Sequence, residues 1–141
     1  TLWTSAASIT VTIFLVACVS TSAAVFFLLQ GAFAIMILET LNYVQHYGLE
    51  RATLPGGNRR EVGRQHSFNS GFGVSNFGLL NLMRHSDHHL FPRRPFPLLR
   101  LESDVPMLPL PIAMMMILAY VPWLWRGVMD RRAMSANAAC L

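Results

Sequence analysis

The chain has 141 residues, of which 53% are hydrophobic and 13% charged, a balance that is unusual for a soluble domain. Its net charge is +4, and all 11 basic residues are arginines that lie after position 50. No aromatic-interleaved basic groove accompanies them, which argues against nucleic-acid binding and favours contact with anionic lipid. The cysteines, Cys18 and Cys140, support neither a disulfide framework nor a thiolate metal centre, so iron–sulfur chemistry within this chain is excluded.

Residues 2–38 form the first predicted element, because they contain no charged residue and no histidine. A straight helix of that length would span about 55 Å, whereas the hydrocarbon core of a bilayer is about 30 Å thick. We therefore expect a transmembrane helical hairpin over residues 1–47 that breaks near residues 20–22, with a second helix that continues to His46 and stops at Gly48. A buried helix pair of a soluble protein is the alternative, but no charged face is present for solvent.

Residues 48–104 form a predicted cytoplasmic, metal-binding region, since the positive-inside rule places arginine-rich segments in the cytoplasm. A Pro-Gly-Gly-Asn run predicts a loop over residues 50–65, closed as a short hairpin. A helix is expected over residues 75–89, with Ser75 as its cap. Three prolines then end the regular structure.

Residues 105–130 are apolar and nearly long enough to cross a membrane, but four prolines interrupt them. We favour a helix over residues 112–125 that lies in the bilayer interface, rather than a full pass. Three aromatic residues are then expected near the head groups: Tyr120, Trp123 and Trp125. Residues 131–141 are expected to form a disordered tail. These elements together predict an all-α integral-membrane domain with a transmembrane hairpin, a cytoplasmic helix that bears histidines, and an interfacial helix.

Three of the five histidines fall within five residues: His85, His88 and His89. On a helix, positions i, i+3 and i+4 share one face, so their imidazoles can reach a common point. Imidazole is a common ligand of iron, zinc and copper, and this spacing favours a metal site over a solvated histidine patch. Asp87 could orient a ligand ring through a hydrogen bond, and an ion pair with Arg84 is the alternative.

His46 stands at the end of the second predicted helix. Glu39 and Asn42 precede it by seven and four residues, on roughly the same helical face. Each is therefore a candidate to hydrogen-bond a ligand histidine, although a water-solvated carboxylate is the alternative for Glu39. His66 has no histidine close to it in the sequence, and we interpret it as structural rather than metal-bound.

Two segments that contain these histidines resemble membrane alkane 1-monooxygenases, which share the histidine boxes of the fatty-acid-desaturase-like superfamily. Residues 42–49, Asn-Tyr-Val-Gln-His-Tyr-Gly-Leu, are similar to the family segment Asn-Tyr-x-Glu-His-Tyr-Gly-Leu. Residues 82–89, Leu-Met-Arg-His-Ser-Asp-His-His, are similar to Leu-Gln-Arg-His-Ser-Asp-His-His. The similarity extends through residues 67–70, 74–76 and 128–130, and so covers most of the chain.

The resemblance implies a diiron enzyme of the inner membrane that activates O₂ at the cytoplasmic face and hydroxylates the terminal methyl of an n-alkane. Rubredoxin supplies the electrons in that family. Carried over residue by residue, the resemblance implies four iron ligands: His46, His85, His88 and His89. The residues that could orient those rings are Glu39, Asn42, Asp87 and His66. An unactivated C–H bond demands a metal–oxygen oxidant that acid–base side chains cannot supply, which agrees with this reading.

The family's other two histidine motifs, His-Glu-x-x-His and Glu-His-x-x-x-His-His, have no counterpart in these residues. The chain also begins without Met and without a basic leader, so we expect the C-terminal part of a longer enzyme, inactive alone. Gln45 replaces the usual Glu, and Gln65 stands where many relatives have a histidine. Three alternatives stay open: an alkylbenzene-methyl monooxygenase, an acyl-chain desaturase or hydroxylase, and a non-catalytic module that binds zinc.

Overall fold

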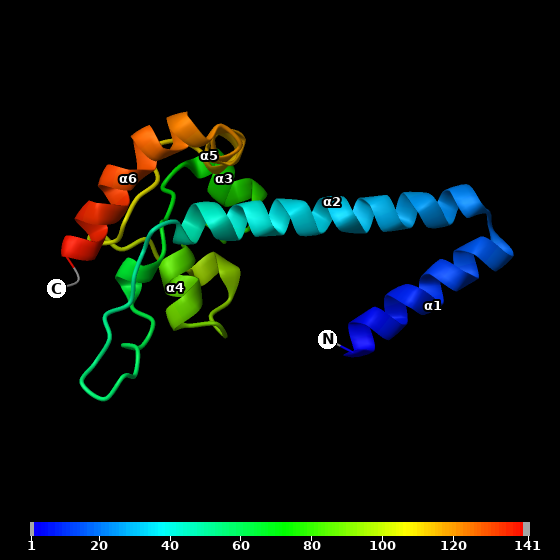
Figure 1. Cartoon of the computed structure of the whole chain (residues 1–141), viewed down its shortest axis with the longest axis horizontal. Coiled ribbons are helices and arrows are strands. Elements are labelled where there is room, and N and C mark those ends of the chain that lie inside the picture. The colour runs from blue at the N-terminus through cyan, green and yellow to red at the C-terminus, as the bar shows by residue number, and fades with distance from the viewer. Residues whose placement is uncertain (1, 140–141) are drawn as a thin grey trace. The chain divides into compact units, whose positions relative to one another are not determined.

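The structure is a computed structural model that describes residues 2–139, and its regular elements are helices (Figure 1). The longer helices are α1 (Leu2–Cys18), α2 (Thr21–His46), α3 (Gly73–Gly78), α4 (His85–Leu90), α5 (Ile112–Ala119) and α6 (Pro122–Ala138). Two 3-10 turns, η1 (Arg64–His66) and η2 (Phe96–Leu98), lie between them. The chain forms two compact units that divide between Glu39 and Thr40. This all-helical architecture of the described residues agrees with the all-α part of the expected fold class.

The N-terminal unit contains α1 and most of α2. Helix α2 has 26 residues with a mean hydropathy of 2.0, and among the described residues it is the one helix long and apolar enough to cross a membrane. The break between α1 and α2 falls at residues 19–20, beside the predicted position. Ser20 explains it, because its Oγ accepts a hydrogen bond from the backbone N–H of Ala23 (3.1 Å) and so caps the start of α2.

The core of the C-terminal unit forms where α6 packs against the last turns of α2. The ring of Trp125 lies 5.4 Å from that of Tyr43 and 5.1 Å from that of Tyr47. The largest fully buried apolar side chains of the core are Trp125, Phe68, Met83, Met115, Met129 and Val44. Trp125 is only 1% exposed, so its expected place near head groups is wrong, whereas Trp123 is 75% exposed.

The predicted helix over residues 112–125 is divided in two. Helix α5 ends at Ala119 and α6 begins at Pro122, because proline lacks an N–H and holds the preceding residue, Val121, out of the helical region at φ −119° and ψ 84°. The expected disordered tail is also wrong as far as Ala138, since α6 continues to that residue. Residues 140–141 of that tail lie outside the described residues.

The end of α6 is held against the turn that follows α2. Asn137 accepts a hydrogen bond from the Glu50 N–H (3.0 Å) and donates one to the Gly48 carbonyl (2.8 Å). Gly48 has φ +64°, which confirms it as the stop of α2. A Cβ atom at Gly48 would lie 2.9 Å from the Cβ of Ala133, so α6 can approach this closely only because position 48 has no side chain.

The predicted helix over residues 75–89 is wrong. Helix α3 ends at Gly78, and a turn with Leu80 at φ 50° and Asn81 at φ 60° separates it from α4. A tertiary hydrogen bond stabilises this turn, since the Asn81 side chain donates to the Phe96 carbonyl (3.1 Å). Ser75 is not a cap, because α3 begins at Gly73 with no side-chain cap. The histidines are therefore carried by a helix of only six residues.

Candidate metal centre

Three histidine side chains meet in the C-terminal unit. Nε2 of His85 lies 3.2 Å from Nε2 of His46. Nε2 of His89 lies 2.9 Å from Nε2 of His85 and 3.3 Å from Nε2 of His46. Metal–nitrogen bonds of about 2.1 Å place two ligand nitrogens about 3.0 Å apart at 90° and about 3.4 Å apart in a tetrahedron. The three separations, 2.9–3.3 Å, are close to this range, so the donor set fits one face of a metal ion's coordination sphere.

The His46 ring is oriented by the main chain. His46 is the last residue of α2, and its Nδ1 lies 2.9 Å from the carbonyl oxygen of His66. A carbonyl can only accept, so Nδ1 carries the proton and the lone pair of Nε2 points to the other two rings. A hydrogen bond of this kind is typical of metal-binding histidines.

The His66 ring does not join the group. Its Nδ1 accepts a hydrogen bond from the Gly63 N–H (2.7 Å). Burial lowers the pKa of His66, and the charges of Arg51 and Arg60 lower it further. His66 therefore contacts a candidate ligand through its carbonyl rather than its ring, in keeping with a structural role.

The other two rings come from α4, where His85 and His89 are one turn apart. Burial, together with electrostatic repulsion from the neighbouring histidines, lowers the pKa of His85 to about 3. Burial also lowers the pKa of His89, and electrostatic repulsion from His46 and His88 lowers it further. Both rings are therefore neutral at pH 7, so protons do not compete with a metal for their lone pairs.

His88 lies beside the group and is not part of it. Its ring centroid is 6.0 Å from that of His85 and 5.9 Å from that of His89. Successive residues of a helix are rotated by about 100°, which places His89 about 40° to one side of His85 and His88 about 60° to the other. Three of the four expected ligands converge, and the fourth, His88, lies outside their group.

Asp87 ties α4 to the segment that follows it. Its buried carboxylate accepts hydrogen bonds from Arg94 Nη1 (2.5 and 2.6 Å) and from the backbone N–H of Arg100 (3.0 Å). The alternative of an ion pair with Arg84 is wrong, because Nη1 of Arg84 donates to the Leu99 carbonyl instead. Asp87 thereby holds in place the helix that carries the histidines.

Glu39 and Asn42 were also expected to hydrogen-bond a ligand histidine. The side chains of Glu39 and Asn42 are exposed. Gln45 is buried, and its Nε2 lies 3.9 Å from Sδ of the buried Met83. The side-chain amide of Gln45, the residue before His46, therefore contacts the thioether of Met83.

Sequence reasoning missed a buried polar cluster behind α4. Asn69 and Ser86 are 1% and 3% exposed and hydrogen-bond to each other twice. Asn69 lies in the Ser-Phe-Asn-Ser run at residues 67–70, whose resemblance to the family was the only available signal.

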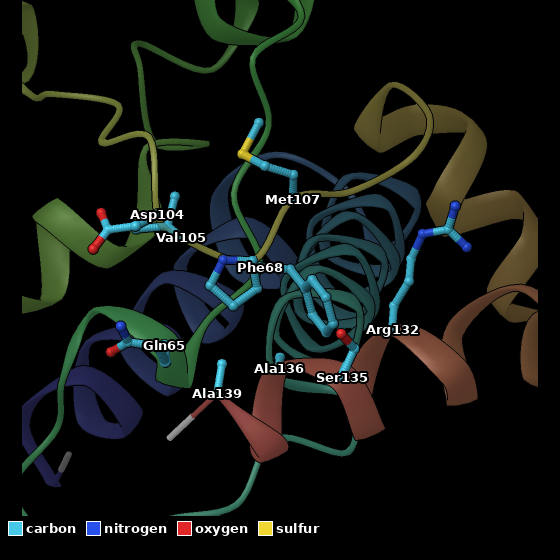
Figure 2. A pocket seen from close by; sticks show the side chains of 10 residues that line it. Gln65, Phe68, Asp104, Val105, Met107, Arg132, Ser135, Ala136 and Ala139 are labelled. Carbon is cyan, nitrogen blue, oxygen red and sulfur yellow. The ribbon is translucent and has the colours of Figure 1, made fainter. Parts of the chain in front are cut away.

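A separate pocket of about 280 Å³ lies where the end of α6 faces two loops (Figure 2). It is lined by Gln65, Phe68, Asp104, Val105, Pro106, Met107, Arg132, Ser135, Ala136 and Ala139. No histidine lines it, so this pocket is distinct from the three-histidine group. Gln65, the neighbour of His66, lines this pocket.

Known proteins with similar sequences define the class to which this chain belongs. Residues 1–110 match the family model described as fatty acid desaturase, and the chain belongs to that family.

The curated relatives it matches are named alkane 1-monooxygenases. The chain is 47% identical over 106 residues to alkane 1-monooxygenase 1 of Pseudomonas aeruginosa, with 75% of this chain and 28% of the relative covered. It is 42% identical over 103 residues to the alkane 1-monooxygenase of Acinetobacter baylyi (73% and 25%). It is 38% identical over 111 residues to that of Pseudomonas putida (79% and 28%). The chain thus spans about a quarter of the length of these relatives, and the resemblance expected from its motifs is confirmed.

Proposed function

We propose that this chain is the C-terminal part of a non-haem diiron monooxygenase that hydroxylates the terminal methyl of n-alkanes. One oxygen atom of O₂ is inserted into the C–H bond to give a 1-alkanol. The other is reduced to water by two electrons that rubredoxin delivers, with two protons taken from solvent. The convergence of three histidine Nε2 atoms from segments 39 residues apart carries the proposal. The names of the relatives support the choice of substrate.

Iron, when bound, supplies the activation of O₂ that acid–base side chains cannot. His46, His85 and His89 offer neutral nitrogen donors to one iron, and such donors leave positions open for O₂. His88 is proposed as a further iron ligand from the resemblance alone. The five histidines of this chain are too few to supply all four of the family's histidine motifs, the two found here and the two without a counterpart. We therefore place the other two clusters in the part of the relatives that this chain does not span.

Four residues are proposed to keep the ligand rings in place. The His66 carbonyl orients the His46 ring, and Asp87 anchors α4 through its bonds to Arg94 and Arg100. Glu39 and Asn42 keep this role as a proposal that rests on their helical spacing from His46.

The proposed location is the inner membrane, with α1 and α2 as a transmembrane hairpin and the metal at the cytoplasmic face. Glu39 and Thr40 follow the uncharged stretch of α2, so Thr40 would lie near one interface. The hydroxyl of Thr40 hydrogen-bonds that of Tyr120 (2.8 Å), just after α5. Tyr120 is 62% exposed, and tyrosine is enriched at membrane interfaces, which supports an interfacial α5.

Rubredoxin is proposed to dock on the cytoplasmic region of residues 48–104. This region carries most of the arginines of the chain. A small acidic electron carrier would be electrostatically complementary to such a surface.

The test is to express the complete protein with its electron donor and to measure 1-alkanol from an n-alkane. His85→Ala should abolish the product, because it removes a donor from the three-histidine group, whereas Met134→Ala, at an exposed position of α6, should retain it. Full activity of the His85 variant would refute the proposal.

The same assay separates the alternatives. Turnover of an alkylbenzene or an acyl chain in place of an alkane would identify the related oxygenases. Purified protein that contains zinc without iron would favour the non-catalytic module.

A further inference from the structure

Helix α4 carries two of the three converging histidines, yet it has no cap of its own. It spans six residues, and its N-cap residue, Arg84, makes no side-chain cap hydrogen bond. The first N–H groups of any helix lack intrahelical acceptors, and helices this short are not stable in isolation. Another part of the chain must therefore fix the first turn of α4, in which His85 lies.

Asn69 supplies that fixation. Its Oδ1 accepts a hydrogen bond from the backbone N–H of Ser86 (2.9 Å), an otherwise unpaired donor of the first turn. Its Nδ2 donates to Oγ of the same serine (2.7 Å). The Ser86 hydroxyl in turn donates to the carbonyl of Arg64 (2.6 Å). One buried amide therefore holds both the main chain and the side chain of the residue next to His85.

The segment that contains Asn69 is also attached to the end of α2. The Phe68 N–H donates to the Gln45 carbonyl (2.7 Å), and the His66 carbonyl accepts from Nδ1 of His46 (2.9 Å). Both main-chain groups of Asn69 are bonded as well, its N–H to the Pro106 carbonyl and its carbonyl to the Leu108 N–H (2.8 Å each). Asn69 therefore connects the element that carries His46 to the element that carries His85 and His89.

We propose that Asn69 is a positioning residue of the metal site, which sets the separation of the His46 ring from those of His85 and His89 by capping α4 from a distance. The inference rests on the proposed metal role of these histidines and not on the identity of the substrate. Without Asn69, the first turn of α4 loses its acceptor and two donor nitrogens lose their fixed positions relative to the third. Loss of such supporting contacts typically lowers metal affinity by about 10- to 100-fold.

The test is a Co²⁺ titration of the complete, metal-depleted protein in detergent, followed by visible absorption of the bound ion. Three variants are compared with the unaltered protein: Asn69→Ala, Asn69→Asp and Asn76→Ala. Asn76 is a matched control, because it is also a buried asparagine (7% exposed) whose Nδ2 bonds two carbonyls, those of Ser70 and Phe72, away from α4.

Asn69→Ala is expected to lower Co²⁺ affinity by about 10-fold or more and to change the absorption bands. Asn69→Asp retains an acceptor for the Ser86 N–H and should recover much of the affinity. Asn76→Ala should leave the bands unchanged even where it lowers the thermal midpoint, since a general loss of stability leaves the ligand geometry unchanged. Equal effects of the two alanine variants on the bands, or none from Asn69→Ala, would overturn the proposal.

A second measurement tests the proposal even if the Asn69→Ala variant does not fold. Amide hydrogen exchange in the unaltered protein should protect the Ser86 N–H as strongly as the amides of α6, and exchange at the rate of an exposed amide would overturn the proposal. Failure of the metal site itself gives a different result, because His85→Ala would then leave the Co²⁺ titration unchanged.

Discussion

Replacement of Gly48 by alanine should destabilise the C-terminal unit by about 2–5 kcal/mol. Part of this cost is the left-handed backbone at φ +64°, which disfavours a Cβ by about 1–2 kcal/mol. The remainder is steric, because the new Cβ would lie 2.9 Å from the Cβ of Ala133, and overpacking of this kind costs about 1–3 kcal/mol. The strain falls two residues after His46, so it also displaces a candidate ligand.

Gly57 provides the matched control. It has φ +83°, and nothing lies within 4 Å of a Cβ added there, so Gly57→Ala should show the backbone cost alone. Urea unfolding followed by tryptophan fluorescence measures both variants. The steric part should disappear when Gly48→Ala is combined with Ala133→Gly and compared with Ala133→Gly alone. If Gly48→Ala costs no more than Gly57→Ala, the close packing of α6 on this turn is refuted.

Three further predictions concern other contacts of the C-terminal unit. Trp125→Ala should cost about 3–5 kcal/mol because the ring is buried, whereas the exposed Trp123 should tolerate alanine with little loss, and equal losses in urea unfolding would contradict this packing. Asp87→Asn should cost about 2–3 kcal/mol, since it leaves its arginine partner without a carboxylate; an unchanged urea midpoint would count against this contact. The hydrogen bond to Asp130, with burial, raises the pKa of Tyr47 from 10.0 to about 12. Its stabilising effect is therefore complete below pH 10 and is lost as pH rises toward 12. An ultraviolet titration should show this, and Asp130→Asn should return the midpoint toward 10.

The elements that sequence predicted well are those whose cause is local. The uncharged run and Ser20 mark the break between α1 and α2, and Gly48 ends α2 because only glycine adopts its backbone conformation readily. The spacing of His85 and His89 likewise follows from helical geometry alone.

The elements that sequence reasoning missed depend on distant contacts. The turn at Asn81 is held in part by a carbonyl 15 residues away, and the sequence does not reveal that contact. Asn69 and Ser86 are 17 residues apart and carry no periodic pattern. The burial of Trp125 rather than Trp123 depends on which face of α6 meets Tyr43 and Tyr47. Composition gives the apolar character of a segment, but tertiary packing decides its orientation.

The most direct test of the metal centre is anomalous diffraction at the iron absorption edge from crystals of the complete protein. One iron peak is expected within about 2.1 Å of the Nε2 atoms of His46, His85 and His89 together. Iron density bound elsewhere, or rings of these three histidines that point away from a common ion, would contradict the account.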